Sequence, residues 1–371
     1  MLLNSIKLTN FKNYEALSLQ FCDGINCFVG ENGMGKTNLL DAIYLSCMTK
    51  NYFGLTDRQL VFHERDFFRI ESNFEKEALQ KVVAKFQKGK KKEITLNGKT
   101  YDKFSEHIGR FPIVMVSPDD IKVILEGSEV RRKFIDNVLS QEDPFYLKSL
   151  MDYNRILKQR NAALKSMKDR GGPDEELLLT YDNQMLEPAA FIHERRKAFL
   201  SDFIPVLKAM YLVISGGNEQ VNCIYKSSLN DQPLALALKE TRMKDFYLQY
   251  TSKGIHKDDL VFEFEDRPLK KFASQGQRKT FLLALKLAQF EFLRRKKGNA
   301  PILLLDDIFD KLDHLRVNKL VKLLTQESFG QVFITDTDES RMTNLVEKTD
   351  LNFLRFTIKE GKAYQEHEAQ R

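Results

Sequence analysis

The sequence predicts an α/β fold in which a mixed sheet is interrupted by a helical insertion, and three observations support this. An apolar run at residues 25–29 leads into a glycine-rich loop and then into an apolar helical pattern, which is the order strand, loop, helix. Residues 280–336 alternate helical patterns with very apolar strands, as parallel sheets with crossover helices do. Between these parts, residues 129–212 carry long helical patterns of mixed charge.

The remaining elements follow from periodicity and turn residues. Residues 2–20 alternate apolar and polar positions, which is typical of half-buried strands. Residues 68–104 are expected to form antiparallel hairpins, because Asn97-Gly98 is a strong two-residue turn. Residues 111–116 form another buried strand, and Pro173 opens a new helix after a break. Strands return around residues 261–266.

This order divides the chain into three segments. Residues 1–128 hold the glycine-rich loop and an antiparallel β subdomain, residues 129–245 form a mostly helical insertion or lid, and residues 246–371 complete the first domain. The chain has 371 residues, of which 42% are hydrophobic and 30% charged, so it has ample material for packed cores. Disordered and collagen-like classes are therefore excluded.

Composition restricts location and partners. No stretch approaches 18 consecutive apolar residues and the start lacks a secretory signal, so we expect a cytoplasmic protein without a membrane partner. The four cysteines lack metal-binding spacing and are expected to be buried thiols. The net charge of +6 suggests a polyanionic partner only where it is concentrated.

The glycine-rich loop fits the phosphate-binding pattern G-x-x-x-x-G-K-[ST] in its proper context. Its residues are Gly30, Glu31, Asn32, Gly33, Met34, Gly35, Lys36 and Thr37. Glycines let backbone N–H groups surround phosphate oxygens, and the following helix adds positive potential at its N-terminus. Lys36 would reach the β- and γ-phosphates and the Thr37 hydroxyl would coordinate Mg²⁺. The loop predicts nucleotide binding without choosing among kinases, GTPases and ATPases.

A second nucleotide motif is the apolar strand at residues 301–305, which ends in two acids. A buried parallel strand would present Asp306 beside the phosphate-binding loop, where it could hold Mg²⁺ directly or through water. Asp307 could polarise an attacking water. Lys36, Asp306 and Asp307 are thus the candidate catalytic residues, with Thr37 and Asp306 as the metal ligands.

A third segment precedes the helix at 278–293 and resembles the LSGGQ-type signature of ABC ATPases. It consists of Ala273, Ser274, Gln275, Gly276 and Gln277. Taken alone, it could be no more than a polar helix cap. In ABC ATPases the signature covers the γ-phosphate bound by the other subunit, so the resemblance implies a nucleotide-dependent dimer. Leu312-Asp313 and Thr337 take the places of the D-loop and of the switch histidine in that family.

The whole chain resembles the bacterial RecF family, whose ATPase head is similar to SMC proteins. Lys36 and Ser274 are 238 residues apart, too far for a compact transporter ATPase and too near for an SMC coiled coil. The segments that carry the resemblance are residues 8–14 (LTNFKNY), 116–120 (VSPDD), 127–136 (GSEVRRKFID), 254–260 (GIHKDDL) and 273–277 (ASQGQ). Lys12 and Lys257 stand where arginine is frequent, and Ile255 where proline is expected.

The resemblance implies the fold of an ABC-type P-loop ATPase head with a helical insertion. It also implies ATP and Mg²⁺ as cofactors, with Lys12 and Asn13 joining the ATP-binding residues. The expected activity is a weak DNA-stimulated ATPase that acts as a switch in an ATP-dependent homodimer. The implied partners are single- and double-stranded DNA, gapped junctions, RecR and RecO, and the implied roles are RecA loading in repair, replication maintenance and SOS induction.

Clustered basic residues are the candidate DNA contacts. Residues 81–110 hold nine Lys or Arg against three Asp or Glu. The candidates are Lys88, Lys90, Lys91, Lys92, Arg131 and Arg132. The hairpin lysines could instead face solvent, and the two arginines could form structural ion pairs.

Three other classes of protein remain to be compared. An ATPase subunit of another DNA or transport system would leave the RecF-like segments unaccounted for. A chromosome-organising head without catalytic importance would show no ATPase rate that DNA stimulates. A P-loop small-molecule kinase is disfavoured by the signature segment.

Overall fold

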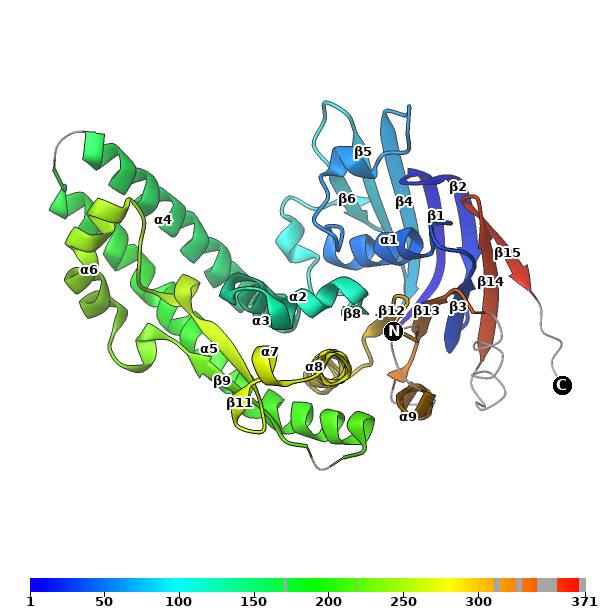
Figure 1. The fold of residues 1–371 in the computed structure, drawn as a ribbon. Coiled ribbons are helices and arrows are strands. Elements are labelled where there is room, and N and C mark those ends of the chain that lie inside the picture. Colours follow the sequence, from blue (N-terminus) through cyan, green and yellow to red (C-terminus); the bar gives the residue numbers. More distant parts are fainter. Residues whose placement is uncertain (170–171, 218, 310–313, 325–328, 339–351, 367–371) are drawn as a thin grey trace. The chain divides into compact units, whose positions relative to one another are not determined.

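The structure is a computed structural model that describes residues 1–169, 172–217, 219–309, 314–324, 329–338 and 352–366 (Figure 1). The chain forms two compact units. Unit 1 comprises Met1–Asp120, Val213–Ser215 and Leu283–Arg371, and unit 2 comprises Ile121–Leu212 and Gly216–Leu282. Each unit is therefore built from segments that are separate in the sequence.

The first sheet of unit 1 is antiparallel and has the strand order β2-β1-β4-β5-β6-β7. Its strands are β1 (Leu2–Phe11), β2 (Tyr14–Gln20), β4 (Phe67–Glu75), β5 (Leu79–Gln87), β6 (Glu93–Leu96) and β7 (Lys99–Thr100). Asn97 and Gly98 join β6 to β7 with φ angles of 51° and 81°, in the left-handed region that a tight hairpin turn requires. The hairpins expected over residues 68–104 are therefore present.

The second sheet of unit 1 has the order β15-β14-β3-β13-β12-β8, and only β15 is antiparallel to its neighbour. Its strands are β3 (Ile25–Val29), β8 (Ile113–Val116), β12 (Ile302–Leu305), β13 (Val332–Asp336), β14 (Phe353–Lys359) and β15 (Lys362–Glu366). Every residue of β3, β8, β12 and β13 is buried. This explains their near-continuous apolar sequences, since parallel strands are covered on both faces.

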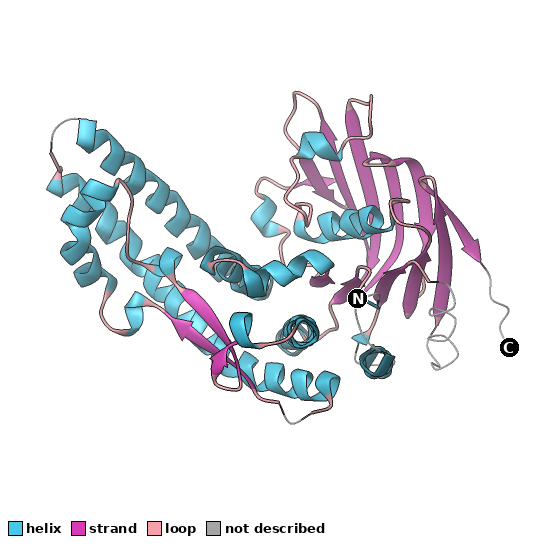
Figure 2. Cartoon of the chain, viewed as in Figure 1, coloured by secondary structure: helices cyan, strands magenta, loops and turns pink. Residues whose placement is uncertain are grey.

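Helix α1 (Lys36–Met48) belongs to the main core of unit 1 together with side chains from both sheets. Figure 2 shows α1 alongside the strands of this unit. Phe28, Phe333 and Phe356 pack at the middle of the second sheet, each within ring contact of Phe21. The other helical elements here are η1 (Asp57–Leu60), η2 (Phe104–Glu106), η3 (Pro118–Ile121), the larger part of α8 (Gln275–Lys297) and α9 (His314–Leu324).

His107 lies inside unit 1, where its Nε2 donates to the Ser46 carbonyl at 2.7 Å and its Nδ1 accepts from the Tyr101 hydroxyl at 3.2 Å. Burial lowers the pKa of His107 from 6.5 to about 4, because the charged ring would lose its hydration. Between pH 6.5 and about pH 4, His107 is therefore protonated in the unfolded chain but not in the folded chain. Stability is complete above the unfolded pKa and declines as the pH falls from 6.5 towards 4.

We expect this site to reduce the free energy of unfolding by about 3 kcal/mol across that interval. Urea unfolding of the wild type and of His107→Phe at pH 7 and pH 4.5 tests this, since the variant keeps a ring but cannot take up the proton. His63→Phe is the matched control, because the His63 side chain is exposed. Equal pH dependence in the wild type and His107→Phe would contradict the assignment.

Unit 2 combines long helices with a small antiparallel sheet of order β11-β10-β9. Its helices are α2 (Lys122–Leu125), α3 (Ser128–Glu142), α4 (Pro144–Asp169), α5 (Glu175–Ser215), η4 (Ser228–Asn230), α6 (Leu234–Leu248), η5 (Ile255–Lys257), α7 (Leu269–Phe272) and the start of α8. The strands are β9 (Val221–Lys226), β10 (Asp259–Phe264) and β11 (Arg267–Pro268).

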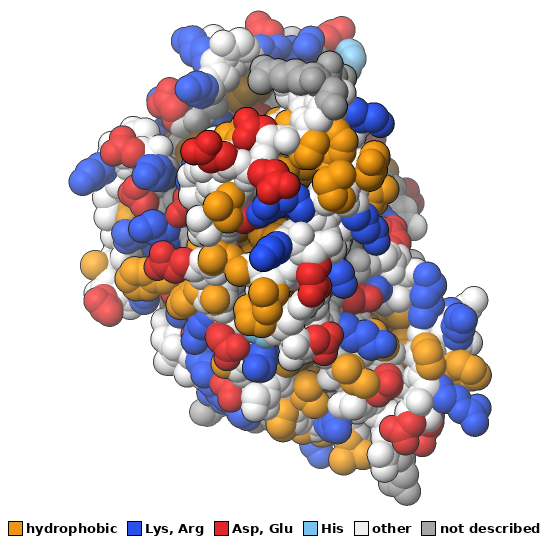
Figure 3. Space-filling view, turned by 90° about the vertical axis from the view of Figure 1, so that its left-hand side faces the viewer, with side chains coloured by type: hydrophobic (Ala, Val, Ile, Leu, Met, Phe, Trp, Pro, Cys, Tyr) orange, Lys and Arg blue, Asp and Glu red, His pale blue; other side chains and the backbone are white. Residues whose placement is uncertain are grey.

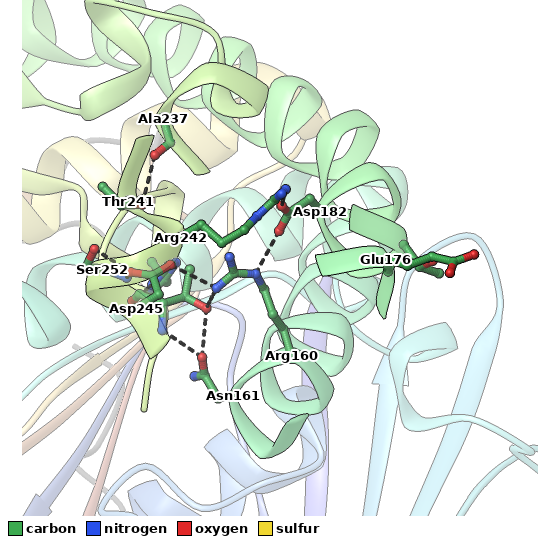
Figure 4. A network of polar contacts seen from close by, with 12 residues as sticks. Arg160, Asn161, Glu176, Asp182, Ala237, Thr241, Arg242, Asp245 and Ser252 are labelled. Atoms are coloured by element: carbon green, nitrogen blue, oxygen red, sulfur yellow. Dashed lines mark hydrogen bonds and ion pairs between the residues drawn. The ribbon is translucent and has the colours of Figure 1, made fainter. Parts of the chain in front are cut away.

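Two fully buried arginines connect the helices of unit 2. Arg160 of α4 pairs with Asp182 of α5 at 2.8 Å and with Asp245 of α6 at 2.9 Å (Figure 4). Arg196 of α5 pairs with Asp136 of α3 at 2.8 Å and with Asp258 at 2.9 Å. Because a buried charge is tolerated only when it is paired, these contacts fix how the helices pack.

The compact units differ from the segments expected from the sequence. The expectation placed residues 246–282 with the phosphate-binding loop, whereas they pack in unit 2, because β10 pairs along its whole length with β9. Helix α6 was not expected. Helix α5 begins at Glu175 with Asp174 as its N-cap, rather than at Pro173.

Helix α5 is long and apolar enough to cross a membrane by length and composition, a test that a buried helix of a soluble protein also passes. Arg196 of this helix lies in the ionic contacts of unit 2. All four cysteines are free thiols, and three of them are buried as expected.

Candidate nucleotide-binding site

The phosphate-binding loop lies between β3 and α1 and has a backbone that requires glycine. Gly30, Gly33 and Gly35 have φ angles of 149°, 82° and 115°. A Cβ atom on Gly30 would lie 2.4 Å from the Ile358 carbonyl oxygen of β14, and one on Gly35 would lie 2.3 Å from the Asn13 side chain. The loop therefore combines left-handed backbone with close packing on both sides.

Lys36 is the first residue of α1, and its side chain turns back over the loop. Its Nζ donates to the carbonyl oxygens of Gly30 at 2.7 Å and Glu31 at 3.0 Å. The residue is only 4% exposed. The structure therefore places this ammonium over the glycine-rich loop, and its expected contact with phosphate oxygens stays a prediction.

Residues at the turn between β1 and β2 support the loop from behind. The Asn13 amide donates to the Met34 carbonyl at 3.0 Å, and the Tyr14 hydroxyl donates to the Gly35 carbonyl at 2.9 Å. Asn38 in turn donates to the Asn13 side-chain oxygen at 2.8 Å. The sequence identified Asn13 but missed Tyr14 and Asn38, because only the fold brings these two segments together.

Lys12 lies in the turn between β1 and β2 and contacts Asp41, which is about one turn beyond Lys36 on α1. Its Nζ is 2.6 Å from the carboxylate of Asp41 and 5.3 Å from the Phe53 ring centroid. The other Asp41 oxygen accepts from the Tyr52 N–H at 2.6 Å. In this structure the Lys12 ammonium therefore contacts Asp41 of α1 and does not contact the phosphate-binding loop.

Asp306 follows β12 and meets the first turn of α1. The Thr37 hydroxyl donates to its Oδ1 at 2.8 Å, although the two residues are 269 positions apart. Parallel strands end at the same edge of a sheet, and β13 alone separates β12 from β3. The structure thus brings together Thr37 and Asp306, the two residues expected to hold Mg²⁺.

Thr335 is a further residue of this site that the sequence did not single out. Its hydroxyl donates to Asp306 Oδ1 at 2.9 Å and accepts from the Asp307 N–H at 2.9 Å. Thr337, named for the switch position, lies two residues beyond it and is half-buried. Thr335 directly follows the apolar residues Val332–Ile334 of the neighbouring strand, and that position was the available signal.

The two acids of the site differ in environment. Burial raises the pKa of Asp306 from 3.8 to about 6, while the hydrogen bonds from Thr37 and Thr335 oppose that shift. Asp307 is half-buried and has a left-handed backbone with φ of 45°. A bound cation would favour the charged form of Asp306.

The donor set fits Mg²⁺. A hydroxyl and a carboxylate oxygen in contact are hard ligands, and Mg²⁺ in nucleotide sites takes one or two protein groups together with phosphates and water. Over the ranges that the structure describes, three or more His, Cys, Asp or Glu side chains are nowhere grouped to hold a metal. A Mg²⁺ ion held by Thr37 and Asp306 would take its remaining ligands from phosphates and water.

The signature segment belongs to unit 2. Ser274 and Gln277 cap the start of α8 reciprocally: the Ser274 N–H donates to the Gln277 side chain at 2.7 Å, and the Gln277 N–H donates to Ser274 Oγ at 3.2 Å. Gln277 also donates to Glu219 at 2.6 Å. Ser274 and Gln275 are exposed, and Gly276 is half-buried. The segment is therefore a helix cap whose outer residues face solvent; Leu312 and Asp313 lie outside the described residues.

The basic candidates fall into two groups. In the hairpin, Lys92 pairs with Asp57 at 2.7 Å and Lys88 with Asp66 at 3.4 Å. Lys90 and Lys91 are exposed and form no ion pair with any residue of the described ranges. These two lysines are the hairpin cations available to a polyanion.

The two candidate arginines have structural roles in unit 2. Arg131 binds Asp259 in a bidentate pair, with distances of 2.7 and 3.0 Å. Arg132 donates to the Asp258 carbonyl at 2.6 Å. The sequence left open whether these arginines contact DNA or form structural contacts, and the structure shows structural contacts.

Comparison with known proteins identifies the relatives of this chain. A family model described as the RecF/RecN/SMC N terminal domain matches residues 2–359. A protein named DNA replication and repair protein RecF from Flavobacterium johnsoniae is 47% identical over 359 residues, which cover 96% of this chain and 100% of that protein. The protein of the same name from Bacteroides thetaiotaomicron is 43% identical, with 97% and 98% covered.

Solved structures agree with this relationship. The structure described as the recombination mediator protein RecF-ATP in the RecFOR pathway is 30% identical with a TM-score of 0.87, and covers 98% of this chain and 97% of that one. An Smc head domain from Pyrococcus furiosus has a TM-score of 0.56 at 18% identity, with 98% and 95% covered, and shares the fold alone. The ABC-type ATPase head with a helical insertion, expected from the sequence, is therefore confirmed.

Proposed function

Because the chain belongs to the RecF family, we propose that it is an ATP-dependent, DNA-binding recombination mediator that acts through an ATP-linked dimer. The observation that carries the proposal is the contact between Thr37 and Asp306 below the phosphate-binding loop. It joins the two nucleotide motifs at one edge of the second sheet. The ATP-bound RecF structure, similar over the whole chain, supports ATP as the nucleotide.

The residues of unit 1 define how ATP would be handled. Lys36 and the loop amides would bind the β- and γ-phosphates, while Thr37 and Asp306 would hold Mg²⁺, which would neutralise charge on the phosphate oxygens. Asp307 is the group that would orient the attacking water. Many ABC ATPases have glutamate there, and aspartate is one methylene shorter. A displacement of about 1 Å can cost roughly 10²-fold in rate, so hydrolysis is slow and ATP acts as a switch.

The exposed signature segment supplies the second half of the nucleotide site in this proposal. Ser274 and Gly276 of one copy would close over the γ-phosphate bound by another. Small residues at a helix N-terminus receive an anion without a steric clash. The capping pair of Ser274 and Gln277 keeps this end of α8 ordered before nucleotide arrives.

DNA is the second ligand in this proposal. Lys90 and Lys91 at the hairpin tip are the available contacts, and binding through phosphates would fall steeply with salt and depend little on sequence. We propose gapped junctions as substrates, RecR and RecO as protein partners, and RecA loading and SOS induction as the outcome. We expect the protein to act in the cytoplasm.

Sedimentation velocity with and without a non-hydrolysable ATP analogue tests the proposal. The wild type is expected to be monomeric alone and dimeric with the analogue and Mg²⁺. Ser274→Arg is expected to bind the analogue with unchanged affinity but to remain monomeric, because the larger cation blocks closure over the γ-phosphate. Dimerisation of Ser274→Arg on nucleotide would show that the signature segment does not act across the interface.

A further inference from the structure

The segment 254–260 carries part of the family resemblance, yet the proposed function assigns it no role. Most of its polar side chains point into unit 2. His256 bonds to the Tyr153 hydroxyl at 2.7 Å and donates to the Thr251 carbonyl at 2.9 Å. Asp258 forms an ion pair with the buried Arg196, and Asp259 forms one with the half-buried Arg131.

Lys257 is the exception in that segment. It is exposed, and its Nζ lies 4.8 Å from the ring centroid of Tyr250, a cation–π contact. Over the described residues it forms no ion pair with an acid. The segment therefore presents one cation on a rigid support, next to an aromatic ring.

Further lysines and another tyrosine surround this pair. We call the set the tyrosine–lysine surface, and its members are Lys244, Tyr247, Tyr250, Lys253 and Lys257. Tyr247 is 67% exposed and Tyr250 is 44% exposed. Tyr247 lies in the last turn of α6, and Tyr250 lies two residues beyond the end of this helix. Figure 3 views the molecule from the side that carries α4, α5 and α6 in Figure 1. On that face basic, acidic and hydrophobic side chains are intermixed.

The segment that carries this surface has few acidic residues. Between residues 241 and 258 the only acids are Asp245 and Asp258. Asp245 is fully buried against Arg160, and Asp258 is buried against Arg196. Both acids of this segment therefore pair with buried arginines, and neither pairs with the exposed lysines of the segment.

The neighbouring helix α4 extends the positive potential. The Thr251 N–H donates to the Asn161 side chain at 2.8 Å, which fixes the segment after α6 against α4. Lys158 and Lys165, both exposed, lie about one turn before and one turn after Asn161 on the same face of α4. Helix α4 therefore adds two exposed lysines near the segment that follows α6.

Exposed aromatic rings among unpaired lysines are the chemistry that binds single-stranded nucleic acid. Unpaired bases stack on aromatic side chains while lysines bind the phosphates. Bases in a duplex already stack on each other, so the tyrosines would gain nothing from double-stranded DNA. An acidic protein segment could form ion pairs with the lysines, but it would have no need of the two exposed tyrosine rings.

We infer that the tyrosine–lysine surface of unit 2 binds single-stranded DNA. The inference rests on the proposed function and refines it by naming the part that takes the unpaired strand of a gapped substrate. The hairpin lysines Lys90 and Lys91 remain the contacts for duplex.

Fluorescence anisotropy with the full chain tests this, using a labelled single-stranded oligonucleotide and a blunt duplex of equal length. Tyr247→Ala and Tyr250→Ala should each weaken single-strand binding about ten-fold and leave duplex binding unchanged, as expected for the loss of one stacked base. Lys253→Gln and Lys257→Gln should each lower the slope of log affinity against log salt by about 0.7. A bromodeoxyuridine-substituted oligonucleotide should crosslink to Tyr247 or Tyr250.

Two exposed residues provide matched controls: Tyr364→Ala in unit 1 and Lys208→Gln on α5 should behave as the wild type. Unchanged single-strand affinity in both tyrosine variants, or crosslinks elsewhere, would overturn the inference. An equal loss of duplex binding would overturn the single-strand preference. If the variants keep single-strand affinity but lose RecR or RecO, the surface serves a protein partner and the inference is wrong.

The same samples separate this inference from the proposed function. If the wild type dimerises on nucleotide and binds gapped DNA while the tyrosine variants do so equally well, only the inference fails. If the wild type binds no form of DNA, the proposed function fails as well.

Discussion

Arg196→Met is expected to lower the free energy of unfolding by about 3–5 kcal/mol, the range for removing one partner of a buried ion pair. The Arg196 guanidinium is 1% exposed and binds Asp136, Asp258, the Ile255 carbonyl and the Tyr146 hydroxyl, all between 2.8 and 3.1 Å. Methionine fills much of the same volume but leaves the buried carboxylate of Asp258 and the half-buried carboxylate of Asp136 without this cation. Urea unfolding followed by far-UV circular dichroism measures the effect.

The neighbouring arginine provides the control. Arg195 also pairs with acids, Glu142 and Asp143, but its side chain is 33% exposed. Ion pairs near the surface contribute about 0–1 kcal/mol, so Arg195→Met should change stability little. If the two variants were equally stable, Arg196 would not hold the helices of unit 2 together.

Lys36→Ala is expected to weaken nucleotide binding by about ten-fold to a hundred-fold, because hydrogen bonds to charged groups are worth about 1.5–3 kcal/mol. The ammonium is buried over the loop, where it would exchange the Gly30 and Glu31 carbonyls for phosphate oxygens. Calorimetric titration with Mg·ATP gives the change in affinity directly.

Lys7→Ala removes an exposed lysine from β1 in the same unit and serves as the control for net charge. It should bind Mg·ATP as tightly as the wild type. Wild-type affinity in Lys36→Ala would mean that the glycine-rich loop does not bind the phosphates, and the proposed function would then lose its basis.

Local patterns predicted the parts of the fold that depend on nearby residues. The Asn97-Gly98 turn and the glycines of the phosphate-binding loop are required by backbone geometry, so their residue types indicate the structure directly. The meeting of Thr37 and Asp306 could also be predicted, because it needs only the rule that parallel strands end at one edge.

Contacts that depend on the order of strands or on distant partners could not be predicted. Thr335 reaches Asp306 because β13 lies between β3 and β12, and no local pattern specifies that order. Arg131 had two plausible roles, since its partner Asp259 is 128 residues away. Helix α6 could not be predicted from its pattern of apolar residues, because its charged residues Arg242 and Asp245 point inward and form ion pairs with Asp182 and Arg160.

The strand order of the second sheet has a consequence for how the protein is made. β3 lies between β13 and β14, and Lys359 at the end of β14 follows Val29 at the end of β3 by 330 residues. At synthesis rates of about 5–20 residues per second, β3 waits roughly 15–65 s on the ribosome for both neighbours. The strands of the first sheet all lie within the first 100 residues and can pair much earlier. The nucleotide site, which needs β3 and β12 together, is therefore among the last parts of the nascent chain to form.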